Sequence, residues 1–172
     1  LPGGCAIGSR PVDLHLFALK KLGAKIKIKN GYIYAEAKNG LKGATIRFPI
    51  ISVGATENAL LAAYMTKGKT ILKNCAIEPE IQDLILFLRK LGAKIKISGR
   101  TIVIKGSKIK KKLISHKIIF DRIEAGTYLI ASALIGKRVI INKINPGIIK
   151  NEIEILKKMG VKIKKHTNAI TI

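Results

Sequence analysis

Apolar and polar residues follow two simple periods along most of this chain. Segments in which Ile alternates with Lys have the period of two that is typical of a strand with one solvated face. Other segments repeat their apolar residues every three or four positions, as an amphipathic helix does. The predicted helices cover 14–22, 54–66 and 80–91. The predicted strands cover 24–29, 32–37, 44–48, 69–74, 93–97 and 101–105, with a hairpin turn at 98–100.

An internal repeat organises these elements. The sequence LKKLGAKIKI ends at Ile28, LRKLGAKIKI ends at Ile97, and a diverged copy, LKKMGVKIKK, ends at Lys165. The spacing gives a unit of about 68 residues, which suits a β-α-β-α-β-β module and predicts an α/β protein. A full copy runs from about 44 to 105 and another from about 117 to 172, while an earlier copy is cut. We expect helices to end at glycines that adopt a left-handed conformation, namely Gly68, Gly92, Gly136 and Gly160.

The charge of the chain is strongly positive. Its 172 residues carry 33 Lys and Arg against 10 Asp and Glu, a net charge of +23, which invites a nucleic-acid partner. The distribution argues against one, because 27 of the 33 are lysines, and many alternate with Ile on a strand face. The densest cluster, 108–112, has no interleaved aromatic residues on which bases would stack.

Several absences narrow the class of protein. No apolar run approaches the roughly 20 residues of a membrane span, and the start lacks the pattern of a signal peptide. We therefore expect a soluble, cytoplasmic protein without a membrane partner, and, because the chain begins with Leu, a fragment or a processed chain. Cys5 and Cys75 form neither a disulfide framework nor a zinc-ligand spacing, so no metal is predicted. Cys75 follows a strand-like run and is expected in the core.

The residues that bear chemistry are concentrated in the first fourteen, LPGGCAIGSRPVDL. Three glycines surround Cys5 and allow the backbone to turn sharply and approach a ligand, while Arg10 supplies a guanidinium. Asp13 stands where the N-cap of the first helix belongs. The loop suits a nucleophile or acid beside an anion site, but it equally suits a small residue in a loop before a capped helix.

A second candidate site is the sequence SVGA at 52–55, directly before a predicted helix. Free N–H groups at a helix start, with a small Gly54 and the hydroxyl of Ser52, form a natural seat for a diphosphate. The signal alone is weak, because any capped helix looks similar.

Four blocks in order carry a resemblance to a known family. LPGGCAIGSRPVDLHL, SVGATENALLAA, NCAIEPEI and DRIEAGTY resemble segments of the UDP-N-acetylglucosamine enolpyruvyl transferases, relatives of the 5-enolpyruvylshikimate-3-phosphate synthases. The resemblance implies transfer of the enolpyruvyl group of phosphoenolpyruvate to the 3′-hydroxyl of UDP-N-acetylglucosamine, an early step of peptidoglycan synthesis, without a cofactor. It also implies a two-lobed α/β fold, an inside-out barrel of β-α-β-α-β-β units with three units in each lobe.

The resemblance assigns roles to particular residues. Cys5 matches the family's mobile-loop cysteine, to which proton donation and product release are attributed and which fosfomycin alkylates. Arg10 matches an arginine that meets the phosphate-bearing substrate. The implied substrate-binding residues are Arg10, Pro11, Val12, Asp13 and Leu14, with uridine beside the last four, and Ser52, Val53 and Gly54 at the diphosphate. Ile50 stands where some relatives have a lysine, so one phosphate contact is in doubt.

Domain organisation is also implied by the resemblance. The chain is expected to pass between lobes near Phe120, with 1–120 in the catalytic-side lobe and 121–172 at the start of the second. Other active-site residues of the family lie upstream and downstream of this stretch, so we expect the 172-residue chain alone to be inactive. Leu14, Phe17 and Leu22 are expected to be partly exposed at the severed repeat. The alternatives are the sister activity on shikimate-3-phosphate and an inactive basic binding module.

Overall fold

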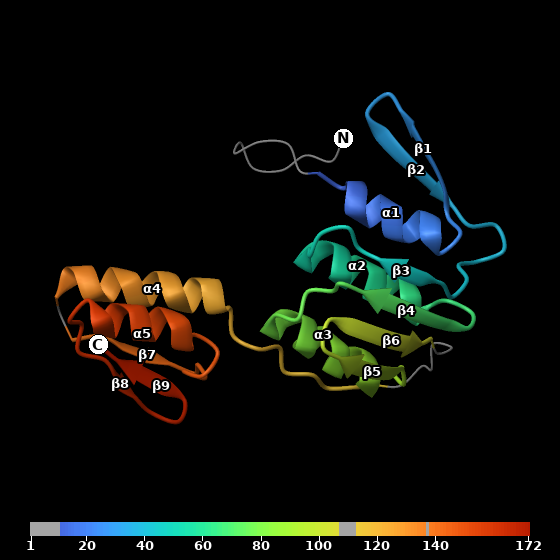
Figure 1. Cartoon of the computed structure of the whole chain (residues 1–172). Helices are drawn as coiled ribbons and strands as arrows, with labels where there is room; N and C mark the ends of the chain where they lie inside the picture. The colour runs from blue at the N-terminus through green and yellow to red at the C-terminus, as the bar shows by residue number, and fades with distance from the viewer. Residues whose placement is uncertain (1–10, 107–112, 137) are drawn as a thin grey trace. The chain divides into compact units, whose positions relative to one another are not determined.

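The structure is a computed structural model that describes residues 11–106, 113–136 and 138–172 (Figure 1). The chain divides into two compact units, Leu1–His116 and Lys117–Ile172. The assignment of 1–120 and 121–172 to two lobes stays a prediction.

Unit 1 is built from two sheets and three helices. Its helices are α1 (Asp13–Lys21), α2 (Val53–Tyr64) and α3 (Pro79–Lys90). Its strands are β1 (Lys25–Lys29), β2 (Tyr32–Glu36), β3 (Thr45–Arg47), β4 (Lys69–Lys73), β5 (Lys94–Ser98) and β6 (Thr101–Lys105). β1 and β2 form an antiparallel pair, and the second sheet has the order β3-β4-β6-β5, in which β3 runs parallel to β4 and the other pairs are antiparallel.

The core of unit 1 lies between its four-stranded sheet and its helices. α2 packs between α1 and α3 (Figure 1), and all three helices contact the sheet. Small residues on α2, among them Ala55, Ala59 and Ala63, are fully buried, which lets the neighbouring helices approach closely. α3 buries Ile81, Ile85 and Leu88, the period expected of an amphipathic helix.

Unit 2 is smaller and repeats the later part of the same module. Its elements are α4 (Arg122–Ile135), β7 (Ile140–Asn142), α5 (Lys150–Lys158), β8 (Lys164–Lys165) and β9 (Ala169–Thr171). The sheet order is β7-β9-β8. Leu129, Ile153 and Ile170 are fully buried at the centre of its core. Among the described residues of unit 2, no strand precedes α4 as β3 precedes α2, so the repeat is incomplete there.

Most predicted elements are present within one or two residues of their expected ends, and Cys75 is fully buried as expected. The prediction for Gly68 is wrong, because α2 ends at Tyr64 and its C-cap is Met65. Thr66 closes that last turn by donating its hydroxyl to the carbonyl oxygen of Ala63 at 2.9 Å. Gly68, with φ of 95°, instead leads into β4.

The helix endings at the other three glycines are confirmed. Gly136 is itself the C-cap of α4 with φ of 68°. Gly92 and Gly160 follow the C-caps of α3 and α5, with φ of 99° and 95°. A residue without Cβ takes this conformation at little cost, and each of these helices ends there.

The severed repeat is better covered than the sequence suggests. Leu14 and Phe17 are half-buried, as expected, but Leu22 is fully buried, so the prediction of its exposure is wrong. The segment before β3 folds back under α1, where Lys42 N–H donates to the carbonyl of Leu22 at 2.9 Å and Leu41 packs against the same core. Unit 1 thereby supplies its own cover for the end of α1.

Candidate functional site

The described end of the first motif, residues 11–14, leads into α1. Val12, not Asp13, is the N-cap, with φ of −114° and ψ of 12°, and no side chain caps this helix. The N-cap prediction for Asp13 is wrong because the carbonyl of Val12 already accepts the first intrahelical bond, from Leu16 N–H at 3.0 Å. Asp13 lies exposed in the first helical turn, where its negative carboxylate is attracted to the positive end of the helix dipole. Its carboxylate is therefore not used as a cap.

The second motif forms the start of α2. Ser52 is the N-cap, and its hydroxyl oxygen accepts from Ala55 N–H at 3.3 Å. Its carbonyl accepts from the Thr56 backbone N–H and, at 2.7 Å, from the Thr56 hydroxyl. Val53 and Gly54 open the helix, whose first turn contains no acidic residue. The first turn of this helix thus places no negative side chain at its positive end.

The two helix starts touch each other at Gly54 and His15. A Cβ added to Gly54 would lie 3.3 Å from Cε1 and 3.4 Å from Nε2 of His15, closer than most such contacts. Glycine at 54 is what lets α1 and α2 approach so closely at this end. The sequence left His15 unassigned, and the structure places it between the two predicted motifs. Nothing in the sequence except its position inside the first block indicated this contact.

Acidic side chains flank this junction. The pKa of the Glu57 carboxyl is raised from its ordinary value, first by burial and then by the charge of Glu80, while His15 opposes the shift. Glu57 belongs to α2 and Glu80 to the first turn of α3. Charged groups near the starts of all three helices of unit 1 therefore influence one another. The N–H groups at these helix starts suit an anion, and a partly buried acid, Glu57, lies beside them.

Of the four remaining predicted site residues, Pro11 is exposed just before α1 and Leu14 lies half-buried in its first turn. The other two, Cys5 and Arg10, lie outside the described residues. Ile50, where some relatives have lysine, is exposed before Ser52. Cys75 is no candidate nucleophile, since burial raises the pKa of its thiol to about 11 and its backbone N–H and C=O are both bonded to Arg100.

Neither a metal site nor a membrane-spanning helix is present among the described residues. His, Cys, Asp and Glu side chains form no group of three there that could hold a metal ion. None of the helices in that part of the chain is both long and apolar enough to cross a membrane.

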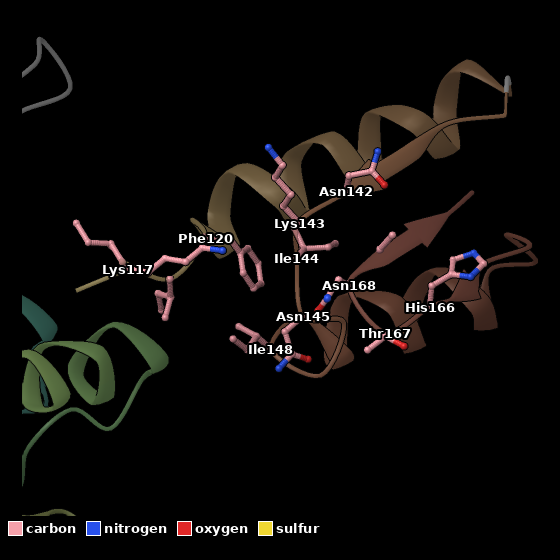
Figure 2. Close-up of a pocket in the computed structure, with 13 residues that line it drawn as sticks. Lys117, Phe120, Asn142, Lys143, Ile144, Asn145, Ile148, His166, Thr167 and Asn168 are labelled. Atoms are coloured by element: carbon pink, nitrogen blue, oxygen red, sulfur yellow. The ribbon is translucent and has the colours of Figure 1, made fainter. Parts of the chain in front are cut away.

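A cavity of about 780 Å³ lies within unit 2, is lined by none of the predicted site residues, and was not predicted (Figure 2). Three stretches line it, 117–120, 142–145 and 166–169, together with Ile148. The only signal in the sequence is a set of turn-forming asparagines, Asn142, Asn145 and Asn168, which mark loops rather than a ligand.

Comparison with known proteins identifies the class. The family model described as EPSP synthase (3-phosphoshikimate 1-carboxyvinyltransferase) matches residues 1–172. The chain belongs to this family of carboxyvinyltransferases. It is 57% identical to the UDP-N-acetylglucosamine 1-carboxyvinyltransferase of Pelagibacter ubique and 56% identical to that of Endomicrobium trichonymphae. These alignments cover 100% and 99% of this chain but 41% of each relative, so the chain spans about two fifths of their length.

Solved structures confirm the predicted fold class. The enolpyruvyl transferase NikO from Streptomyces tendae superposes with a TM-score of 0.81 at 25% identity, covering 95% of this chain and 42% of that one. The EPSP synthase of Acinetobacter baumannii gives a TM-score of 0.70 at 21% identity, covering 99% of this chain and 41% of that one. The repeated α/β units are those of the enolpyruvyl transferase fold.

Proposed function

We propose that the full-length protein transfers the enolpyruvyl group of phosphoenolpyruvate to the 3′-hydroxyl of UDP-N-acetylglucosamine, releasing phosphate, without a cofactor. In this reaction the hydroxyl oxygen adds to C2 of the enol while a proton is delivered to C3. Phosphate then leaves, and loss of a proton from C3 restores the double bond. The proposal is carried by the contact between the starts of α1 and α2, which brings the two substrate motifs together.

The nucleotide end of the substrate is assigned to these two helix starts. The diphosphate lies at Ser52, Val53 and Gly54, because the first turn of α2 offers N–H groups and contains no acidic side chain. The uridine lies along 11–14, where Pro11 and Leu14 give apolar surface. The exposed Asp13 carboxylate, which caps no helix, accepts from the uracil edge.

The reacting end is assigned to Cys5 and Arg10. Arg10 presents a planar fork of N–H donors to a phosphate. The Cys5 thiol delivers the proton to C3, adds covalently to phosphoenolpyruvate in a side reaction, and is the atom alkylated by fosfomycin. Both assignments rest on the resemblance of the first block. We place the enzyme in the cytoplasm.

The activity is tested with the full-length protein by measuring phosphate release from phosphoenolpyruvate with either UDP-N-acetylglucosamine or shikimate-3-phosphate as acceptor. We expect turnover only with the nucleotide sugar. Turnover only with shikimate-3-phosphate would establish the sister activity, and a folded protein inactive with both would refute the proposal. The basic-module alternative is tested by titration with DNA at two salt concentrations, since phosphate contacts weaken steeply with salt.

The role of Cys5 has its own test. Some members of the family have Asp at this position, so Cys5→Asp is expected to keep turnover while abolishing inactivation by fosfomycin. Time-dependent loss of activity is measured for both proteins, and Cys75→Ser is the matched control that keeps its sensitivity. If fosfomycin inactivated the Cys5→Asp protein at the normal rate, Cys5 could not be the alkylated residue, and its assignment to the site would be refuted.

The isolated 172-residue chain is expected to neither turn over substrate nor bind UDP-N-acetylglucosamine tightly. Substrates in this family lie between two lobes, and an incomplete site lacks the contacts and the water exclusion that closure provides. Calorimetric titration of the chain with the nucleotide sugar measures this directly. Micromolar affinity together with one cooperative melting transition would show that the chain is self-sufficient.

A further inference from the structure

The third sequence block, NCAIEPEI at 74–81, has no part in the function proposed above. Its first residue follows β4 directly, and the loop that leads to Ser52 follows β3 directly. β3 and β4 are adjacent and parallel, so the two loops leave the sheet at the same edge (Figure 1). The third block therefore lies beside the start of α2.

Hydrogen bonds from the third block hold both ends of the loop before α2. The side-chain amide of Asn74 donates to the carbonyl of Phe48 at 2.9 Å, where the loop begins. Asn74 has φ of 59°, a conformation that asparagine tolerates better than most residues with a side chain. The backbone N–H of Ala76 donates to the hydroxyl oxygen of Thr56 at 3.1 Å, one turn into α2. The position of the helix start thus depends on the third block.

The Thr56 hydroxyl both accepts and donates a hydrogen bond. It accepts from Ala76 N–H and donates to the carbonyl oxygen of Ser52 at 2.7 Å. The backbone N–H of Thr56 donates to the same carbonyl at 3.1 Å. Thr56 and Ala76 are fully buried, so water cannot replace either partner. The bonds therefore form a fixed chain from Ala76 through Thr56 to Ser52.

This chain of bonds fixes the direction of the peptide unit between Ser52 and Val53. A planar trans peptide points its C=O and its N–H in opposite directions. Because the carbonyl of Ser52 points along the helix toward Thr56, the N–H of Val53 points out of the start of α2. The N–H of Ala55 is already bonded to the Ser52 hydroxyl at 3.3 Å. Since the first N–H groups of a helix have no acceptor within it, those of Val53 and Gly54 are left for a ligand.

We propose that Thr56 is a positioning residue for the nucleotide sugar. Its buried hydroxyl holds the peptide between Ser52 and Val53 so that the N–H groups of Val53 and Gly54 meet the diphosphate. Ala76, in the third block, holds the hydroxyl in turn. Thr56 acts through this peptide and not by contact with the substrate. The proposal rests on the assignment of the diphosphate to the start of α2 and adds the residue that orients its donors.

Two substitutions of Thr56 in the full-length protein test the proposal by steady-state kinetics. Thr56→Val keeps nearly the same shape but removes the hydroxyl, which leaves the buried N–H of Ala76 without its acceptor. We expect KM for UDP-N-acetylglucosamine to rise about tenfold, while kcat and KM for phosphoenolpyruvate change less than about twofold, because binding is lost away from the reacting atoms. Thr56→Ser keeps the hydroxyl and should keep KM within about twofold of the unmodified enzyme. An unchanged KM in a folded Thr56→Val protein, or equal losses in both variants, would overturn the proposal.

A matched control lies just beyond the other end of α2. Thr66 is also buried, and its hydroxyl donates to the carbonyl of Ala63 at 2.9 Å. Thr66→Val should lower the Tm of the full-length protein, as Thr56→Val does, but leave KM for the nucleotide sugar unchanged. If Thr56 had only a structural role, both variants would combine a lower Tm with a normal KM, and the proposal would be wrong.

Hydrogen exchange of the unmodified full-length protein decides the question if Thr56→Val fails to fold. We expect UDP-N-acetylglucosamine to slow exchange of the Ala76 amide at least about fivefold more than that of the Thr66 amide, because the ligand stabilises the peptide to which Ala76 is linked. Equal slowing of the two amides would overturn the proposal. An unmodified enzyme that neither binds the nucleotide sugar nor turns it over would instead refute the proposed function, and this proposal with it.

Discussion

The starts of α2 and α4 occupy the same place in two copies of one repeat, yet their electrostatics are opposite. α2 is capped by the neutral Ser52 and has no acid in its first turn. α4 is capped by Asp121, whose carboxylate accepts from Ile123 N–H at 2.8 Å and Glu124 N–H at 3.1 Å, and Glu124 adds a second negative charge. The positive end of α4 is already neutralised by its own residues, whereas that of α2 is left for an anion. One copy of the module has the features of a binding site and the other those of a structural cap.

Exchanging the two caps should have the largest effect. Ser52→Asp keeps an effective N-cap but places a carboxylate at the proposed diphosphate seat, so we expect KM for UDP-N-acetylglucosamine to rise at least about 100-fold through like-charge repulsion. Steady-state kinetics of the full-length protein measure this. The reverse change, Asp121→Ser, is the control and should leave KM unchanged. An unaltered KM for Ser52→Asp would refute the assignment of the diphosphate site to the start of α2.

A smaller effect is expected where the two helix starts touch. Gly54→Ala places a Cβ 3.3 Å from the His15 ring, so α1 and α2 must separate slightly, and we expect KM for the nucleotide sugar to rise about tenfold. Gly126→Ala in α4 is the matched control, because a Cβ there meets nothing within 4 Å. The double variant Gly54→Ala, His15→Ala should recover most of the loss. No recovery would mean that the glycine matters for another reason.

The smallest effect concerns Glu57, five residues after its N-cap, where α4 has Gly126. Because burial and Glu80 raise the pKa of Glu57 in the folded state, its ionised form opposes folding. The favourable contribution of the protonated form is complete below the unfolded pKa and is lost as the pH rises through the folded pKa. We expect Glu57→Gln to raise Tm at pH 7 by no more than about 3 °C and to leave it unchanged at pH 4. Thermal melts at both values check this, and a gain at pH 4 would contradict the explanation.

The strongest sequence patterns predicted the fold well. The apolar spacing of Ile81, Ile85 and Leu88 fixed α3, and the Lys–Ile alternation fixed the strands that follow the repeated glycines, because these signals are local. The start of α1 was misplaced by one residue, since Asp13 is a typical cap and Val12 is not, yet the backbone of Val12 begins the helix without a capping side chain.

Long-range contacts decided what the sequence left open. Residues 114–116 stand at the position of β3 when the N-caps Ser52 and Asp121 are aligned. The contacts of Ser115 with Lys90 and of His116 with Asp83 show that they attach to α3 instead. The proximity of His15 to Gly54 joins residues 39 positions apart, and no local pattern encodes it. The two helix-start motifs were predicted individually, but their contact was not.

The burial of Cys75 makes its rate of labelling by a thiol reagent a measure of how often the core of unit 1 opens. The sequence contains two cysteines, and the one in the core has a thiol pKa of about 11 and is fully buried, so it reacts with a thiol reagent only when unit 1 opens. In the native chain at neutral pH, any rapid labelling therefore reports on Cys5. The slow second label measures how often the core of unit 1 is breached, and a single time course separates substrate protection of the first thiol from stabilisation of the whole unit.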